Sequence, residues 1–223
     1  MIEDTDELVR RASQAIGKAG LAHAYGHCSV RLGEHELLVS PAKPLAMVGK
    51  SDAPVRVPIG GPLPDGVLGE VRIHQQVYKQ RPDVHGIVRF QSPKVVSLSA
   101  LGRTPLARHG FGAYFAPKPA LWSDPRLVRD DARAEGVANA LGGGRAIVLR
   151  GNGAVVVGAS LQEACALAWY LEDAARVELE VLASGEPGLV LTAEEAADRA
   201  TSQGRIFERM WDWLTRDLPA SGS

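Results

Sequence analysis

Apolar residues recur at helical spacing in several stretches of the chain. An opening helix is predicted from Asp4, because Asp4 and Glu7 have the spacing of a capping box and the apolar positions that follow keep helical spacing until Gly17. A second helix is predicted over residues 70–80 and is ended by Pro82. The same pattern predicts further helices over residues 92–102, 124–144, 160–183 and 192–214.

Shorter apolar runs, bounded by glycine and proline, predict strands. They cover residues 27–32, 36–40, 55–59 and 84–91, and the two arms of a hairpin over residues 146–158 that turns at Gly-Asn-Gly. The stretches 41–69 and 108–125 are broken by prolines and glycines, so we expect loop there, apart from the strand at 55–59.

The strands cluster between an opening helix and closing helices, which indicates α+β layers without the regular strand–helix alternation of a Rossmann fold. With 223 residues, 45% hydrophobic and 23% charged, the chain can bury a full core. We therefore predict a single domain over residues 1–223, with a flexible tail at 216–223.

Charge and cysteine content exclude several classes of partner. The net charge is −1 and no basic block offers a surface for phosphates, so nucleic acid is not an expected partner. No apolar run approaches the length of a membrane span, and the first residues lack the features of a secretory signal. Cys28 and Cys165 are isolated, which is typical of a reducing compartment. A cytoplasmic protein is the simplest prediction.

The strand VHGIVRFQ carries two unusual polar residues. Arg89 and Gln91 lie two apart, so they project from the same face, opposite Val88 and Phe90. A guanidinium inside a sheet requires an anion. Two partners are open: Glu70, in a structural salt bridge, or a carboxylate of the substrate.

Glu70 and His74 are four residues apart and share one face near the start of their helix, although a first-turn glutamate is also simply favoured by the helix dipole. The six histidines are too dispersed for a local zinc motif. Cys28 is expected to face away from His27 and Ser29 on its strand, which argues against a cysteine–histidine nucleophile.

Several segments, taken in order, resemble the class II aldolase/adducin family. They are YGHCSVRL, LLVSP, GEVRIHQQVYKQRPDV, VHGIVRFQSP and VLRGNGAVVVGASLQEA, and the resemblance extends over about residues 5–210. It implies one α/β/α domain with a central, mainly antiparallel sheet. It also implies a homotetramer with active sites between subunits.

Catalytic members of that family hold a divalent metal through three histidines, two in an HxH strand and one in a hairpin turn. In this sequence the corresponding positions are Arg89, Gln91 and Asn152. Arginine does not coordinate metals and amides bind zinc weakly, so we expect no metal and no cofactor. The resemblance gives Glu70 the role of acid/base.

The substrate expected from the resemblance is a small anion. Leu68 and Gly69 stand where phosphosugar aldolases usually have serines, which argues against a phosphorylated substrate, although Ser40 and Lys43 can still hold an anion. His27 replaces an asparagine of the sugar aldolases, as in members that decarboxylate hydroxylated aromatic or pyridine carboxylates.

The leading hypothesis is a metal-independent lyase, a decarboxylase of a small hydroxylated carboxylate. Arg89, with donors from Gln91 and Asn152, would stabilise an enolate-like oxyanion.

The proton would come from Glu70, His27 or His74. Tyr114 is either a further acid contributed across a subunit interface or an interface aromatic. Two alternatives remain: a noncatalytic, adducin-like binding or assembly protein, and a metal aldolase whose ligands have moved to residues such as His27 or His109.

Overall fold

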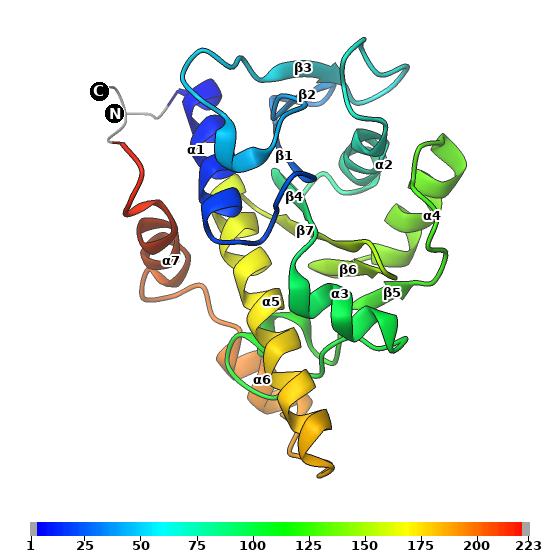
Figure 1. The fold of residues 1–223 in the computed structure, drawn as a ribbon, viewed down its shortest axis with the longest axis vertical. Coiled ribbons are helices and arrows are strands. Elements are labelled where there is room, and N and C mark those ends of the chain that lie inside the picture. Colours follow the sequence, from blue (N-terminus) through cyan, green and yellow to red (C-terminus); the bar gives the residue numbers. More distant parts are fainter. Residues whose placement is uncertain (1–3, 220–223) are drawn as a thin grey trace.

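A computed structural model describes residues 4–219 of the chain, and its centre is a seven-stranded mixed sheet (Figure 1). The strand order is β3-β2-β1-β4-β7-β6-β5; only the β5–β6 pair is parallel, and the other neighbours are antiparallel. The strands are β1 (His27–Arg31), β2 (Glu36–Val39), β3 (Val55–Pro58), β4 (Gly86–Phe90), β5 (Ala120–Trp122), β6 (Ala146–Leu149) and β7 (Gly153–Gly158).

Helices cover both faces of the sheet, as the family resemblance implies. The α-helices are α1 (Thr5–Lys18), α2 (Arg72–Gln80), α3 (Pro93–Ala100), α4 (Asp131–Leu141), α5 (Leu161–Ser184), α6 (Ala193–Arg199) and α7 (Ile206–Thr215). Three short 3₁₀ helices are η1 (Leu45–Met47), η2 (Gly69–Val71) and η3 (Gly112–Phe115). Helices α1, α3, α5 and α7 share one apolar core with the sheet, whereas α2 and α4 pack on the other face.

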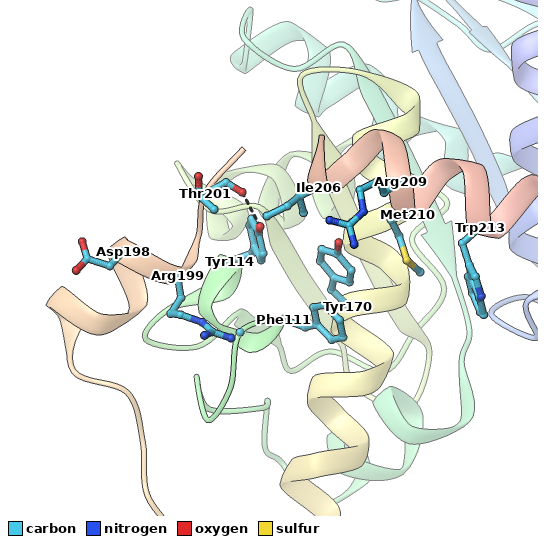
Figure 2. A pocket seen from close by; sticks show the side chains of 11 residues that line it. Phe111, Tyr114, Tyr170, Asp198, Arg199, Thr201, Ile206, Arg209, Met210 and Trp213 are labelled. Carbon is cyan, nitrogen blue, oxygen red and sulfur yellow. Dashed lines mark hydrogen bonds between the residues drawn. The ribbon is translucent and has the colours of Figure 1, made fainter. Parts of the chain in front are cut away.

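The predicted last helix is wrong in one respect, because residues 192–214 form two helices. Thr192 caps α6 in a full capping box with Glu195. Residues 200–205 are not helical; Gly204 has a φ of 68°, outside the range of a right-handed helix. The chain turns there, so that α7 packs beside α5 and encloses a cavity next to Tyr114 (Figure 2).

Two other boundaries differ from the prediction. The stretch 108–125 contains β5, whose three residues are held as an edge strand by parallel pairing with β6. The helix expected from residue 124 begins only at Asp131, since Asp130 is its N-cap and its side chain accepts a hydrogen bond from the backbone N–H of Arg133.

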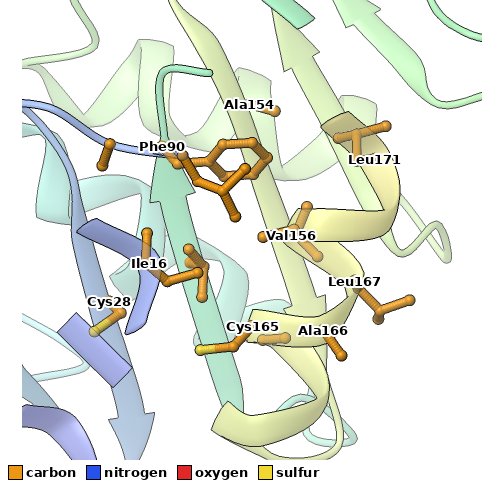
Figure 3. Packing of buried hydrophobic residues seen from close by; sticks show 14 of the residues in the cluster. Ile16, Cys28, Phe90, Ala154, Val156, Cys165, Ala166, Leu167 and Leu171 are labelled. Atoms are coloured by element: carbon orange, nitrogen blue, oxygen red, sulfur yellow. The ribbon is translucent and has the colours of Figure 1, made fainter. Parts of the chain in front are cut away.

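Alternation along the central strands divides the core into two. Val88, Phe90 and Val156 pack against α5 (Figure 3), whereas Ile87 and Val157 belong to the cluster beneath α2 and α4. Both faces are therefore closed by apolar contacts. Any polar side chain on the central strands has to satisfy its hydrogen bonds within the protein or at a cavity.

The end of the described chain is packed. Leu218 is buried, and the backbone oxygens of Asp217 and Pro219 accept hydrogen bonds from Lys18 and Arg11. Of the segment 216–223 expected to be flexible, residues 220–223 lie outside the described residues. Within 4–219, no helix combines the length and apolar character needed to cross a membrane.

Candidate active site

Arg89 and Glu70 form a buried ion pair on the α2 side of the sheet. The guanidinium projects from β4 and Glu70 from η2, and Arg89 Nη2 lies 2.8 Å from Glu70 Oε2. The side chain of Arg89 is 2% exposed and that of Glu70 is 14% exposed. Of the two partners left open by the sequence, Glu70 is the one that Arg89 contacts.

Asn152, at the tip of the β6–β7 hairpin, connects the polar side chains of this site. Its Oδ1 accepts hydrogen bonds from Arg89 Nη2 (2.9 Å) and Gln91 Nε2 (2.5 Å), and its Nδ2 donates to Glu70 Oε1 (3.2 Å). The prediction that Arg89 and Gln91 share a face is confirmed, because both reach the same oxygen. Four of the predicted site residues therefore form one network.

Gly153 holds the hairpin tip against the end of β4. It has a φ of 87°, and a Cβ atom there would overlap the carbonyl oxygen of Phe90. Only glycine combines this backbone conformation with such a close approach. The position of Asn152 is thus fixed by its neighbour.

Beside the ion pair, four buried side chains form a continuous hydrogen-bonded chain. His27 Nδ1 lies 2.9 Å from His74 Nε2, His74 Nδ1 lies 2.6 Å from Ser29 Oγ, and Ser29 Oγ lies 3.0 Å from Tyr78 OH. All four residues are at most 2% exposed. Sequence reasoning missed Ser29 and Tyr78, although Ser29 lies two residues from His27 on a strand and Tyr78 lies four from His74 on a helix.

Burial keeps both histidines neutral. Burial lowers the pKa of His27 well below its usual value, and the nearby His74 and Arg89 lower it further. Burial, followed by the charge of Arg89, lowers the pKa of His74 to about 3. Burial also lowers the pKa of Arg89, which the charge of Glu70 opposes. Neither histidine is a proton donor in its cationic form near neutral pH.

A cavity of about 610 Å³ lies over these groups. Arg89, Gln91, Glu70 and His27 line it, whereas His74 does not. The remaining lining residues are Ala24, Tyr25, Gly26, Ala42, Lys43, Pro44, Leu68, Leu127 and Arg129.

The two predicted anion-binding residues separate in the structure. Lys43 lines the cavity and forms an ion pair with Asp52, Nζ to Oδ2, at 2.8 Å. Ser40 is buried outside the cavity lining, and its hydroxyl oxygen accepts a hydrogen bond from the backbone N–H of Cys28. Arg129 also lines the cavity, and sequence reasoning missed it because it lies in a loop within the segment predicted as a helix.

Tyr114 does not join this site within one chain. It lies on the opposite side of the sheet, in the cavity of about 550 Å³ between α5 and α7, and its hydroxyl donates to the Thr201 carbonyl at 2.6 Å (Figure 2). Burial raises the pKa of Tyr114. A role across a subunit interface stays a prediction.

The donor atoms of the site do not suit a divalent cation. Asn152 Oδ1 already accepts two hydrogen bonds, both oxygens of Glu70 have partners, and a guanidinium lies among them. In residues 4–219, no group of three or more His, Cys, Asp or Glu side chains is arranged to hold a metal ion. His109, a suggested replacement ligand, instead contacts Asp173 of α5, Nε2 to Oδ2, at 2.9 Å.

This fold and site define a member of the class II aldolase and adducin N-terminal domain family, whose model matches residues 7–179. The chain belongs to that family. It is 30% identical over 200 residues to a 3,4-dihydroxyphthalate decarboxylase of Arthrobacter keyseri, covering 80% of this chain and 79% of the relative. It is also 30% identical over 211 residues to a 3,4-dihydroxyphthalate decarboxylase of Terrabacter sp. (strain DBF63), covering 86% and 87%.

Solved structures agree on the fold. An L-fuculose 1-phosphate aldolase from Glaciozyma antarctica PI12 superimposes with a TM-score of 0.80 at 23% identity, covering 95% of this chain and 88% of that one. The predicted family and α/β/α fold are confirmed. The decarboxylase relatives support the predicted lyase activity.

Proposed function

We propose that the protein is a decarboxylase of a small hydroxylated carboxylate, in which the guanidinium of Arg89 takes the electrostatic role of a metal ion. The observation that carries this proposal is the network of Arg89, Glu70, Asn152 and Gln91 beside the cavity. A fixed positive charge in a buried site stabilises developing negative charge without reorganisation.

The cavity walls favour an aromatic substrate. Tyr25, Leu68 and Leu127 are large apolar side chains that are 72%, 40% and 45% exposed, and all three line this cavity. Lys43 and Arg129 add positive charge to the same lining. A flat ring bearing carboxylates fits such a combination, as does the dihydroxyphthalate named for the relatives.

Substrate binding can control when Glu70 takes up a proton, because Glu70 is paired with Arg89. A substrate oxygen that contacts Arg89 competes with Glu70 for the guanidinium, and a carboxylate that loses its cationic partner gains a proton more readily. As the bond to the carboxylate carbon breaks, carbon dioxide leaves and its electron pair forms an enolate-like anion held by Arg89. Glu70 then protonates the carbon, returns to Arg89 as a carboxylate, and is reprotonated from solvent in the next cycle.

The test is carbon dioxide release from hydroxylated aromatic and oxo-acid substrates, measured with chelator present and after elemental analysis of the protein. We expect turnover that chelator does not reduce, and its loss in Arg89→Ala. Arg56→Ala, at an exposed ion pair outside the cavity lining, is the control. Turnover that disappears with chelator and returns with zinc or manganese would instead support an aldolase-type metal site with relocated ligands.

One observation favours a second candidate, a noncatalytic binding or assembly protein. Arg89 and Glu70 already neutralise each other at 2.8 Å, which a purely structural salt bridge would also do. This candidate would be supported if hydroxylated carboxylates bind without turnover and if Glu70→Gln leaves their binding affinity unchanged.

The assembly that we propose is the homotetramer implied by the family. Phe111 and Trp213, which line the same cavity as Tyr114, are 37% and 44% exposed, and a subunit interface would bury them. Light scattering gives the mass directly. Activity recovered by mixing Tyr114→Phe subunits with Arg89→Ala subunits would place Tyr114 in a neighbour's site.

A further inference from the structure

The hydrogen-bonded chain that begins at His27 ends on backbone oxygens. The Tyr78 hydroxyl lies 3.0 Å from the Ser29 carbonyl oxygen and 3.5 Å from that of His85. A carbonyl oxygen only accepts hydrogen bonds, so the Tyr78 proton points to it. This end fixes the direction of the chain.

The remaining protons follow in sequence. Because Tyr78 donates to a carbonyl, its oxygen accepts from the Ser29 hydroxyl, and Ser29 Oγ in turn accepts from His74 Nδ1–H. His74 Nε2 then has a free lone pair, which accepts from His27 Nδ1–H. Four protons fill four contacts, and His27 Nε2 is left as an unprotonated acceptor.

The reverse direction satisfies fewer groups. If Tyr78 donated to Ser29 Oγ instead, each proton would shift by one place and only three contacts would be filled. His27 would then carry its proton on Nε2, which is buried and has no partner among the described residues. Buried N–H groups without partners are rare, so the first arrangement is favoured.

Arg89 has a matching unsatisfied atom. Its Nε, a donor, is also buried without a partner within the described chain. His27 and Arg89 are directly opposed in the antiparallel pairing of β1 with β4, and both side chains line the cavity. One acceptor and one donor therefore lie on the same face of neighbouring strands.

We propose that Tyr78, Ser29 and His74 hold His27 in its Nδ1–H tautomer, and that His27 Nε2 and Arg89 Nε together bind one hydroxyl group of the substrate once the side chains that shield the two nitrogens from the cavity move aside. A hydroxyl oxygen accepts from Arg89 while its hydrogen is donated to His27. A carboxylate or ether oxygen cannot donate, so it meets the lone pair of His27. Ser29, His74 and Tyr78 act as positioning residues. The identity of the ligand rests on the proposed function, whereas the tautomer does not.

The tautomer is tested by ¹⁵N NMR of the imidazole nitrogens in the full-length protein. We expect unprotonated Nε2 and protonated Nδ1 in both His27 and His74. Tyr78→Phe removes the acceptor of the Ser29 proton, which then turns to His74 Nδ1, so both histidines should change to the Nε2–H tautomer although neither contacts Tyr78 directly. Ser29→Ala should do the same by removing the acceptor of His74.

Two substitutions on the opposite face of the sheet serve as controls. Ser13→Ala removes a buried hydroxyl that contacts Val9 and Cys28, and Tyr170→Phe removes a buried phenol beside the other cavity. Neither should alter the histidine signals. Nε2–H tautomers in the unaltered protein, or signals unchanged by Tyr78→Phe, would overturn the assignment.

The hydroxyl preference is tested by calorimetric binding of 2-hydroxybenzoate and 2-methoxybenzoate. We expect the methoxy compound to bind about tenfold more weakly or worse, and the difference to shrink in a folded Tyr78→Phe variant. Equal binding in the unaltered protein would mean that the two nitrogens hold a trapped water, and would overturn the substrate assignment. This outcome can occur whether or not the protein is a decarboxylase.

Discussion

Two buried arginine–carboxylate pairs in this molecule differ in how fully their polar atoms are satisfied. The pair between Arg108 and Glu178 is bidentate, with Nε at 2.5 Å and Nη2 at 3.2 Å. The remaining Nη1 donates to the carbonyls of Pro187 and Leu189, both at 3.1 Å. The side chains are 7% and 4% exposed. This pair attaches two loops to α5, and each of the three guanidinium nitrogens has a partner.

The pair between Arg89 and Glu70 is made by one nitrogen only, Nη2, which also serves Asn152. Arg89 Nε has no partner among the described residues, and a cavity lies beside the pair. A closed pair stabilises the fold, whereas an incompletely satisfied pair next to a cavity is arranged to exchange partners. Four predictions test this difference, from the largest expected effect to the smallest.

Glu178→Gln should cost about 3–5 kcal/mol of unfolding free energy, because it leaves the buried Arg108 without a counter-charge. Urea unfolding measures the loss. A cost below that of Glu70→Gln would contradict the assignment of structural and functional roles to the two pairs.

Mild acid should lower the unfolding free energy, because the buried histidines His27 and His74 bind protons only after unfolding. His27 and His74 have lowered pKa values when folded, so the unfolded chain binds more protons below its histidine pKa of about 6.5. Stability is therefore full above that pH and falls as the pH drops; for His74 the loss reaches about 2.5 kcal/mol at pH 4.5. Unfolding free energies measured from pH 7 to 4.5 give the slope.

The ion pair at Glu178 should contribute little to that slope. Burial raises the pKa of Glu178, but hydrogen bonds from Arg108 and the Leu106 backbone outweigh it and lower the pKa overall. Its stabilisation is lost only at lower pH, as the carboxylate is protonated. The slope should flatten in a His27→Gln/His74→Gln double variant and persist in His23→Gln, which alters an exposed histidine. An equal slope in all three proteins would argue against buried neutral histidines.

Glu70→Gln should cost only about 1 kcal/mol, since Arg89 keeps its bond to Asn152 and water in the cavity can solvate the guanidinium. Decarboxylation should nevertheless be lost. Thermal unfolding and carbon dioxide release, measured on one preparation, separate the two effects. Large destabilisation together with unchanged turnover would reverse the interpretation of this pair.

Glu36→Gln gives the baseline. It removes an exposed ion pair with Arg56, with Nη1 3.4 Å from Oε2, and should change stability by less than about 0.5 kcal/mol. A larger effect in urea unfolding would mean that the differences between the two buried pairs cannot be attributed to burial.

Much of the fold follows from local sequence. The hairpin at residues 146–158 and the long helix capped by Ser160 have strong patterns, and the structure contains both. The patterns failed where contacts distant in the sequence matter: β5 is a strand because β6 pairs with it, and after the break that follows α6 the chain packs α7 against α5.

The sequence predicted most residues of the site but not the hydrogen bonds between them. The two-residue spacing of Arg89 and Gln91 on a strand indicates a shared face, and the structure has it. That Asn152 would join them requires β4 and β7 to be neighbours, which the resemblance supplied and residue spacing alone could not. Ser29 and Tyr78 escaped notice because their importance arises only when α2 lies over β1.

At the hairpin tip, Gly153 determines the backbone geometry, whereas the side chain of residue 152 supplies the polar groups. Its backbone approaches Phe90 too closely for any other residue, so the turn keeps one geometry whatever side chain precedes it. Position 152 can therefore be exchanged without rebuilding the loop, and a single codon change there would give the same scaffold a different reactive group.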